Sequence, residues 1–444
     1  MISLDLNEKK LHTYANIFLG ISFFYLIGPT FRFLNAFIAD YLFLIFAIHV
    51  FFGQVKIKFN FKESRIFLIP FLIILIVTIG KLFSGIELLI DEFANNINYL
   101  KLYFMFCISY TIILNIKDVN FLDNYLKNVF RFLALGVIFV SLISIMQFFN
   151  FKIVETIIEN FYFIQHKTLK ISNLDQFNES NRVVGIFDSY NGCGFFMCFF
   201  TFILIIVTTE VKSFLSTIAI ILGFTTLILT SNRASLITFM IMNFLFFIFI
   251  KKLKNIKVII TILSLILLFL ILAINVSDVI SIGNLNRFLE LKDFVEKGQI
   301  PFTFADRTAA WEWMPQYIFS SRYAMFGFTN ATFLNDLNFR APDNQYLAWF
   351  VTYGIIGAGL LIFWTVYALV KIIKLYKEEA LLKINVLSNI SGGLVVIWIG
   401  LMIEGISQDS CFFGNRWREY FILILSTIAA LKYIRSTKVQ LVNE

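Results

Sequence analysis

The chain has 444 residues, of which 59% are hydrophobic and 15% are charged, and its formal net charge is +8. Soluble domains contain roughly 45–50% apolar and about 25% charged residues, so this composition excludes a soluble globular protein. A mean hydropathy of +0.81 instead predicts an α-helical membrane protein, for which we expect no nucleic-acid partner.

Hydrophobic segments of about 20 residues, the length of one bilayer crossing, predict an all-α polytopic protein with about twelve transmembrane helices. They lie near residues 13–31, 33–53, 65–84, 99–116, 130–151, 185–209, 214–231, 234–250, 258–275, 345–370, 385–406 and 418–434. With 5 Pro and no Ser/Gly/Pro tract to mark a linker, residues 1–444 are expected to form a single integral membrane domain.

The distribution of lysine predicts how these helices are oriented. Placing the N-terminus in the cytoplasm puts the lysine-rich short loops inside, as the positive-inside rule requires. Both termini are then cytoplasmic, and the protein is expected in an inner membrane. Two longer loops face outward: residues 152–184 and, between the ninth and tenth helices, residues 276–344, the large periplasmic loop.

Arginine has the opposite distribution, because nine of the twelve arginines face outward in this topology. An arginine side chain offers a planar fork that binds phosphate oxygens bidentately and stays charged near lipid. The outward arginines therefore suggest an anionic, phosphate-bearing ligand. Alternatively, they decorate surface loops and anchor lipid headgroups.

Two segments at the outer surface place an arginine beside polar residues where a helix begins. The first, Arg182–Gly194, includes Asn191, and the second, Leu229–Ser235, carries Arg233 between two apolar runs. An arginine in a tight turn at that depth is costly without a partner or a ligand. The alternatives are a helix start loosened by glycine in the first segment and an arginine that reaches the headgroups in the second.

The large outer loop contains two segments that look like short amphipathic helices, Arg287–Leu291 and Asp306–Trp313. The second carries Arg307 and Trp311. The ring of Trp311 would either anchor the loop at the headgroups or stack on a sugar ring, and anchoring is the commoner role of tryptophan at this depth.

The tenth predicted helix begins just after Pro342. Proline there favours a helix start, so Asp343 is predicted to be the N-cap or a first-turn carboxylate, with Asn344 next to it. Within the same helix, Gly354 and Gly357 predict a close approach by a neighbouring helix.

Two further acids, Asp40 and Glu404, fall within predicted spans near their outer ends. Acids inside a membrane are functional candidates, although either could instead neutralise an outer arginine. No Asp-x-Asp motif or histidine cluster suggests a metal, and we expect neither a metal nor a cofactor.

Taken in order, these segments resemble the O-antigen ligase and O-antigen polymerase (Wzy-type) superfamily of bacterial polysaccharide assembly. The resemblance covers roughly residues 180–365, and its motifs are RVVGIFDSYNGCG (182–194), TSNRASL (230–236), RFLEL (287–291), DRTAAW (306–311) and DNQYLAWFVTYGIIG (343–357). In the ligase branch the helix after the loop opens with a catalytic histidine. This chain has Asp343 at that position, which favours a polymerase.

The resemblance implies a metal-independent glycosyltransferase with a lipid-pyrophosphate-linked glycan donor. It would transfer a growing glycan from undecaprenyl pyrophosphate to an incoming lipid-linked repeat unit at the periplasmic face. Arg233 and Arg287, with Arg307 as alternative or helper, are assigned to the pyrophosphate. Asp343 would accept the proton of the acceptor hydroxyl or orient one of the arginines. The further candidate substrate-binding residues are Arg182, Asn191, Trp311 and Asn344.

Two other functions remain open from the sequence. One is an O-antigen ligase that joins finished polymer to lipid A–core. The other, from a different class, is a polytopic transporter or a flippase of lipid-linked oligosaccharides, although the chain lacks the internal repeats with interrupted helices that transporters usually have. By family analogy, a chain-length regulator and a flippase are expected partners, in addition to the lipid bilayer.

Overall fold

The fold is known from a computed structural model. It describes residues 8–29, 32–33, 36–52, 64–86, 90–162, 182–187, 189–209, 213–250, 314–316, 318–320, 323–328, 344–381, 385–406 and 417–443. Apart from turns and one pair of two-residue strands, the regular structure of these residues is helical. The predicted all-α polytopic membrane fold is therefore confirmed.

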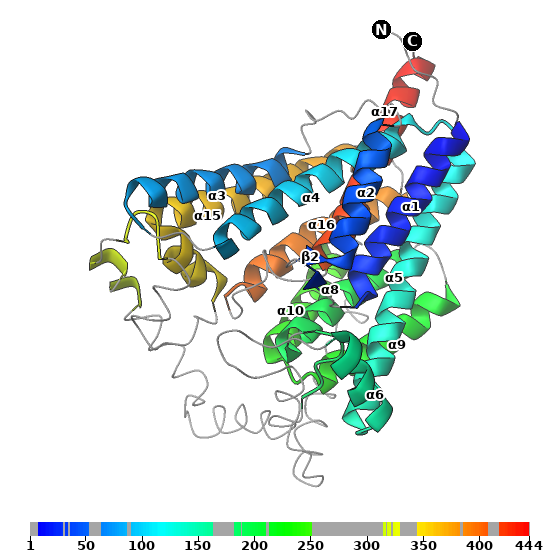
Figure 1. Ribbon diagram of the computed structural model, residues 1–444. Helices are drawn as coiled ribbons and strands as arrows, with labels where there is room; N and C mark the ends of the chain where they lie inside the picture. The colour runs from blue at the N-terminus through cyan, green and yellow to red at the C-terminus, as the bar shows by residue number, and fades with distance from the viewer. Residues whose placement is uncertain are drawn as a thin grey trace.

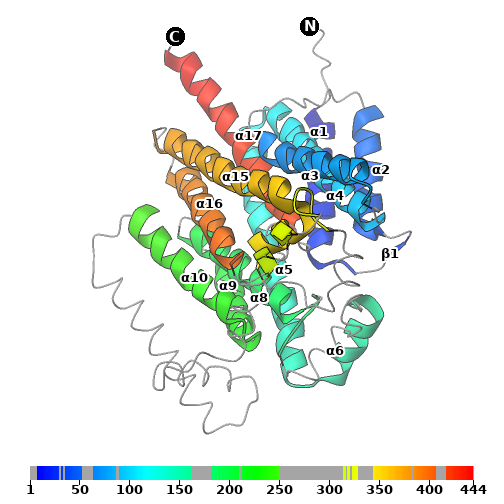
Figure 2. The ribbon, with the colours of Figure 1, turned by 90° about the vertical axis from the view of Figure 1, so that its left-hand side faces the viewer.

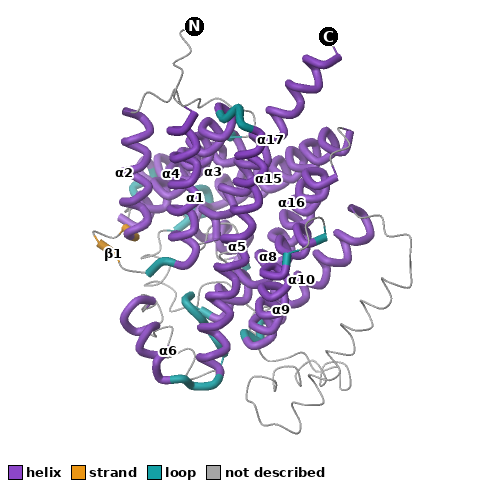
Figure 3. Tube along the Cα trace, turned by 90° about the vertical axis from the view of Figure 1, so that its right-hand side faces the viewer, coloured by secondary structure: helices purple, strands orange, loops and turns teal. Residues whose placement is uncertain are grey.

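Helices of the described residues are α1 (Glu8–Ile27), α2 (Ile38–Phe52), α3 (Arg65–Phe83), α4 (Ile90–Asn115), α5 (Val119–Phe148), α6 (Lys152–Ile157), α8 (Tyr190–Thr208), α9 (Phe214–Leu229), α10 (Arg233–Leu245), α15 (Gln345–Leu381), α16 (Asn385–Glu404) and α17 (Trp417–Asn443). Short π-helical turns continue α6 at Ile158–Tyr162 and α10 at Phe246–Ile250. The strands β1 (Arg32–Phe33) and β2 (Ala36–Phe37) pair antiparallel between α1 and α2. Helix α1 begins and α17 ends at one end of the molecule, and α6 lies at the other (Figure 1, Figure 3).

Each predicted span overlaps a described helix except 258–275, which lies outside the described residues. Within the described part, six helices are long and apolar enough to cross a membrane, and three shorter apolar helices accompany them. The six are Arg65–Phe83, Asn96–Asn115, Val119–Phe148, Tyr190–Thr208, Arg233–Ile250 and Gln345–Lys377. The total of twelve spans, the single-domain organisation and the two long outer loops stay predictions.

Helix α8 lies at the centre of the fold. Of its most apolar stretch 78% is buried, against 33% in α3, and it packs against α5, α9, α10 and α16. Figure 2 shows α10, α16 and α15 running next to one another beside this core. Large apolar side chains such as Phe52 of α2 and Phe83 of α3 are exposed, as expected for surfaces that face lipid.

A charged cluster joins α1, α2, α4 and α17 inside the bundle. The ammonium group of Lys101 binds Asp40 at 2.8 Å and Glu419 at 2.9 Å, and the hydroxyl of Tyr25 donates to Asp40 at 2.8 Å. Asp40 is thus paired with a lysine of a neighbouring helix. Removal of one partner from such a cluster leaves a charge uncompensated in a low-dielectric interior, so the cluster is expected to fix the packing of these four helices.

Helix α15 is interrupted at Gly354, where the backbone adopts φ 66° and ψ −172°. The break receives a returning segment, residues 323–328: the amide of Ile355 donates to the carbonyl of Ala324 at 2.8 Å, and the amide of Phe328 donates to Val351 at 2.7 Å. The sequence predicted a continuous helix with a glycine pair for helix packing. That prediction is wrong at Gly354, because the glycine there admits backbone from the loop and not a neighbouring helix.

The other glycine of the pair does serve helix packing. A Cβ atom at Gly357 would lie 2.8 Å from Val77 of α3, and α15 packs along α3. At the end of α3, the buried ammonium of Lys81 donates to the carbonyl of Phe328 at 3.0 Å. Helix α3 therefore contacts both α15 and the segment 323–328 that precedes it in the sequence.

We expect Gly354→Ala to destabilise the protein, because this backbone region is nearly exclusive to glycine and costs other residues about 1–3 kcal/mol. The added Cβ would also lie 2.4 Å from backbone atoms of Met325. The purified variant should unfold at a lower temperature than wild type when followed by tryptophan fluorescence.

Gly359→Ala is the matched control, because it lies in the same helix and no atom lies within 4 Å of the Cβ position. Equal unfolding temperatures for the two variants would contradict the role assigned to the break at Gly354.

Candidate functional site

Arg233 is the first residue of α10 and follows a tight turn. Ser231 has a positive φ of 49°, and Asn232 is the N-cap, whose side-chain oxygen accepts from the amide of Ser235 at 3.3 Å. The side chain of Arg233 is half-buried. Its guanidinium thus stands at a helix N-terminus, where the peptide dipoles add to its positive potential.

Arg182 lies at the start of the first outer segment and is 2% exposed. Its guanidinium lies over the ring of Tyr190, 4.3 Å from the ring centre. The residues that follow Arg182 are bound by Gln147 of α5, whose side-chain oxygen accepts from the amides of Val184 and Gly185, both at 3.0 Å. Arg182 is therefore held in place next to the N-terminus of α8.

Helix α8 begins directly after this segment. Ser189 is its N-cap and accepts from the amide of Gly192 at 3.1 Å. Asn191, the second residue of α8, is half-buried. One turn further, a Cβ atom at Gly194 would lie 2.8 Å from the Cβ of Asn232. Glycine at 194 thus lets the start of α8 contact the turn that carries Arg233.

The C-terminal end of α16 connects the starts of α8 and α10 to the start of α15. The hydroxyl of Ser235 donates to the carboxylate of Glu404 at 2.5 Å, and both side chains are fully buried. Gly405 directly follows the last residue of α16, and its carbonyl oxygen accepts from the amide of Gln345 at 2.7 Å. The starts of α10 and α15 are therefore tied to one helix end.

Asn344 is the N-cap of α15, because its side-chain oxygen accepts from the amides of Tyr346 and Leu347, both at 3.0 Å. The sequence predicted Asp343 as the N-cap or a first-turn residue, whereas Asn344 is the cap and α15 begins at Gln345. Beside Asn344, a partly open hollow of about 400 Å³ lies between α15 and the side chains of Pro315, Ile318 and Phe319. Its walls include the rings of Phe319, Tyr346 and Phe350, so it offers mainly apolar and aromatic surface.

Three buried side-chain amide atoms around these helix ends have no hydrogen-bond partner among the described residues. They are the nitrogen atoms of Gln147 and Asn232 and the oxygen atom of Gln345. A buried polar group without a partner costs about 1–3 kcal/mol. Such groups therefore favour a polar ligand or ordered water at this place.

The structure brings Arg182, Asn191, Arg233 and Asn344 to adjoining helix ends. The other predicted site residues, Asp343, Arg287, Arg307 and Trp311, lie outside the described residues. Sequence reasoning noticed Glu404 but not its bond to Ser235, and it missed Gln147 and Gln345. Within the described part, no group of three or more His, Cys, Asp or Glu side chains could hold a metal ion.

We expect Glu404→Leu to destabilise the protein by about 1–3 kcal/mol, because it leaves the buried hydroxyl of Ser235 without its acceptor. Transfer activity should fall with it, since Ser235 lies in the first turn of α10 beside Arg233. Glu404→Gln keeps an acceptor oxygen and should retain most of both properties. Thermal unfolding and the glycan product of each variant are the measurements.

Ser235→Ala serves as the control within a double-mutant cycle. Added to Glu404→Leu, it removes the hydroxyl that has lost Glu404 as its acceptor and should restore part of the lost stability. If the two substitutions changed the free energy of unfolding by fully additive amounts, the coupling between Ser235 and Glu404 would be contradicted.

Comparison with known proteins was made by sequence. Residues 218–362 match the family described as O-antigen ligase (Wzy_C), a region that runs from α9 to the middle of α15 and includes Arg233 and Asn344. No curated protein matches the chain. Residues 218–362 are therefore similar to the O-antigen ligase family, and this match does not separate polymerases from ligases.

Proposed function

We propose that the protein is a polysaccharide repeat-unit polymerase of the inner membrane, with both termini in the cytoplasm. It transfers a growing glycan from undecaprenyl pyrophosphate to an incoming lipid-linked repeat unit at the periplasmic face. The family match supports a role in O-antigen or polysaccharide assembly. The choice of polymerase rests on Asp343, which stands where the ligases have histidine.

One observation carries the proposal: Arg233 stands at a helix start that contacts the start of α8 and is tied through Glu404 to the start of α15. Arg182, at the mouth of α8, and Asn344, at the cap of α15, belong to the same region. Two guanidinium groups near a low-dielectric boundary suit a pyrophosphate, because arginine binds phosphate oxygens bidentately and stays charged.

In the proposed reaction, the acceptor hydroxyl oxygen attacks the anomeric carbon of the donor glycan. The bond between that carbon and the pyrophosphate oxygen breaks, and undecaprenyl pyrophosphate leaves with the bonding electrons. Asp343 takes the proton of the hydroxyl. Arg233 and Arg287, with Arg307 as helper, stabilise the charge that develops on the leaving group without a metal.

The remaining candidates bind the two substrates. Arg182 adds positive charge at the mouth of α8, and Asn191, on the first turn of that helix, offers an amide to sugar hydroxyls. Asn344 keeps its amide nitrogen for a sugar, since its oxygen caps α15. Trp311 contributes a ring on which a sugar stacks. A chain-length regulator and a flippase are the expected partners.

A ligase is the second candidate, and the description of the matching family favours it. In that reaction the finished polymer would be transferred to lipid A–core, with the same arginines on the departing pyrophosphate. The two candidates differ in the acceptor and in the residue that takes its proton.

The glycan banding pattern of a strain that lacks this protein tests the proposal. The polymerase predicts a surface glycan truncated to one repeat unit, restored to a ladder by wild type and not by Arg233→Ala. Polymer that accumulates on the lipid carrier above a bare core would indicate the ligase. Single units retained on the cytoplasmic leaflet would indicate a flippase.

A further inference from the structure

Residues 345–353 are a short helix of their own, because the break at Gly354 separates them from the rest of α15. We call them the N-terminal part of α15. Asn344 caps the start of this part, and the hydroxyl of Tyr346 donates to the carbonyl of Met402 of α16 at 2.8 Å. The position of the N-terminal part therefore depends on α16 at one end and on the break at the other.

Residues 323–328 fill the break. In an unbroken α-helix the amide of Ile355 would donate to the carbonyl of Val351, but here both groups bind residues 323–328 instead. Gly327 makes this insertion possible, because a Cβ atom there would lie 2.5 Å from the amide nitrogen of Gly354. The direction in which the N-terminal part leaves the rest of α15 is thus set by where residues 323–328 lie.

Two contacts with the end of α3 hold this inserted segment. The ammonium of Lys81, which is 2% exposed, donates to the carbonyl of Phe328 at 3.0 Å, and the ring of Phe326 lies against Gly80, where a Cβ atom would be 2.3 Å away. The ring of Phe328 belongs to a small buried core with Leu347 of the N-terminal part. A hydrogen bond from a charged donor is stronger than a neutral one, above all in a buried place. Lys81 therefore fixes the segment on α3.

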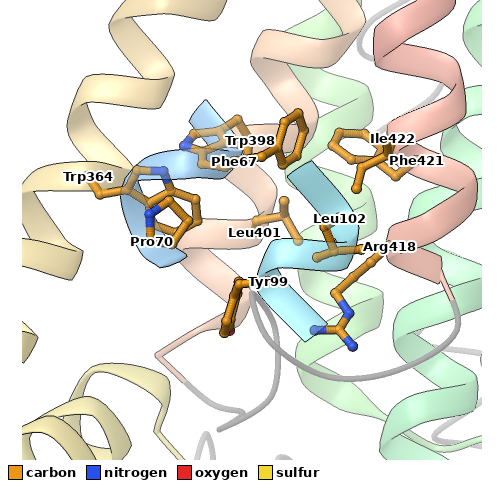
Figure 4. A pocket seen from close by; sticks show the side chains of 10 residues that line it. All are labelled: Phe67, Pro70, Tyr99, Leu102, Trp364, Trp398, Leu401, Arg418, Phe421 and Ile422. Carbon is orange, nitrogen blue, oxygen red and sulfur yellow. The ribbon is translucent and has the colours of Figure 1, made fainter. Parts of the chain in front are cut away.

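Helix α3 is a firm support for the segment, because it is also bound to the rest of α15. Pro70 has no N–H and cannot donate to the carbonyl of Ile66 one helical turn earlier. The indole nitrogen of Trp364 of α15 donates to that carbonyl instead, at 2.7 Å. Trp364 and Pro70 line one small gap of about 40 Å³ (Figure 4). Residues 323–328 are thus held against two helices that are joined along their length.

We propose that Lys81 is a positioning residue of the transfer reaction. Through the carbonyl of Phe328 it holds residues 323–328 in the break of α15, and it thereby fixes where Asn344 lies relative to Arg233. The proposal rests on the proposed function, in which groups at the start of α15 and Arg233 act on one glycosidic bond.

The lever arm makes this position sensitive to the break. Residues 345–353 span about 13 Å, so a turn of about 10° at the break would displace one end by about 2 Å relative to the other. A misplacement of about 1 Å can lower the rate of an enzyme by about 10²-fold. Loss of the bond from Lys81 is therefore expected to slow the chemical step.

The test is Lys81→Met, which keeps the length of the side chain and removes the ammonium group. With purified protein and a carrier-linked repeat unit, kcat should fall by about 10- to 100-fold, while KM changes little. Removal of a buried charge favours the folded state, and loss of this donor to Phe328 opposes it, so the unfolding temperature should stay close to that of wild type. Lys81→Arg keeps a charged donor and should restore most of kcat.

Amide hydrogen exchange, measured without substrate, reports directly on the inserted segment. Lys81→Met should speed the exchange of the amides of Phe328 and Ile355 by about tenfold or more, as loss of a hydrogen bond from a charged donor implies. Phe326→Ala removes the other contact with α3 and should have the same effects on exchange and kcat. Lys374→Met is the matched control, because it removes an exposed lysine of α15, and it should change neither.

A kcat for Lys81→Met within a few-fold of wild type would overturn the proposal, even if exchange were faster. A loss of activity that only follows a lower unfolding temperature, without rescue by Lys81→Arg, would also overturn it, because the lysine would then be structural. If wild type makes no polymer and transfers glycan only to lipid A–core, the proposed function is refuted. The same variants are then compared on that transfer, so the two failures are distinguishable.

Discussion

Replacing Arg233 by glutamine is expected to lower the rate of glycan transfer by about 10²–10³-fold, the usual effect of removing one preorganised donor to a developing negative charge. Arg233 is half-buried at the start of α10. Its position is fixed by the cap at Asn232 and by the bond from Ser235 to Glu404. A fixed cation near lipid stabilises the departing pyrophosphate more than a solvated one would.

Arg233→Lys separates charge from geometry. Lysine keeps the positive charge but loses the bidentate fork, so its rate should lie between those of wild type and Arg233→Gln. Because the effect belongs to the transition state, kcat should fall more than KM rises. The measurement is a steady-state assay with purified protein and a synthetic carrier-linked repeat unit.

Arg65→Gln is the matched control for this series, because Arg65 is exposed at the start of α3, on the side predicted to be cytoplasmic. It should leave the rate unchanged. A rate for Arg233→Gln within a few-fold of wild type would remove Arg233 from the reaction.

Replacing Asp343 by asparagine is expected to lower the rate by about 10²–10⁴-fold if this carboxylate takes the proton of the acceptor hydroxyl, as general bases typically contribute that much. Asparagine has nearly the same shape but cannot accept the proton. The neighbouring cap at Asn344 remains in place, so α15 should still begin at Gln345.

The pH dependence of the rate distinguishes a base from a residue that orients an arginine. If Asp343 is a base, the rate of wild type should fall toward low pH as the carboxylate is protonated. Asp343→Asn should abolish this fall in rate. An orienting role would leave the profile shape intact and lower the rate at every pH.

Asp118→Asn is the control, because Asp118 caps α5 by accepting from the amides of Asn120 and Phe121 and asparagine caps helices equally well. Its rate should match wild type. Wild-type activity in Asp343→Asn would transfer the role of base to another residue.

Hydropathy predicted the helices of this protein well, because a span must be long and apolar wherever its neighbours lie in the sequence. The polar segments at Arg182 and Arg233 were also visible, since charge at membrane depth stands out from an apolar background. Their contact at Gly194 fits the expectation that glycine permits close approach.

The features that were missed depend on packing between distant parts of the chain. Ser235 and Glu404 are 169 residues apart, and Lys101 binds Glu419 across 318 residues, so no local pattern signals either contact. The break at Gly354 was hidden because the residues around it are apolar and favour a helix. The cap was placed at Asp343 instead of Asn344 because both residue types cap helices.

The most direct measurement of the central claim uses purified protein in liposomes with a carrier-linked repeat unit as the sole glycan substrate. Product chain length and released undecaprenyl pyrophosphate are followed by mass spectrometry. The polymerase predicts a ladder of products on the carrier and one released carrier pyrophosphate for each bond formed. Absence of any product until lipid A–core is added, followed by transfer to it, would contradict the polymerase and identify a ligase.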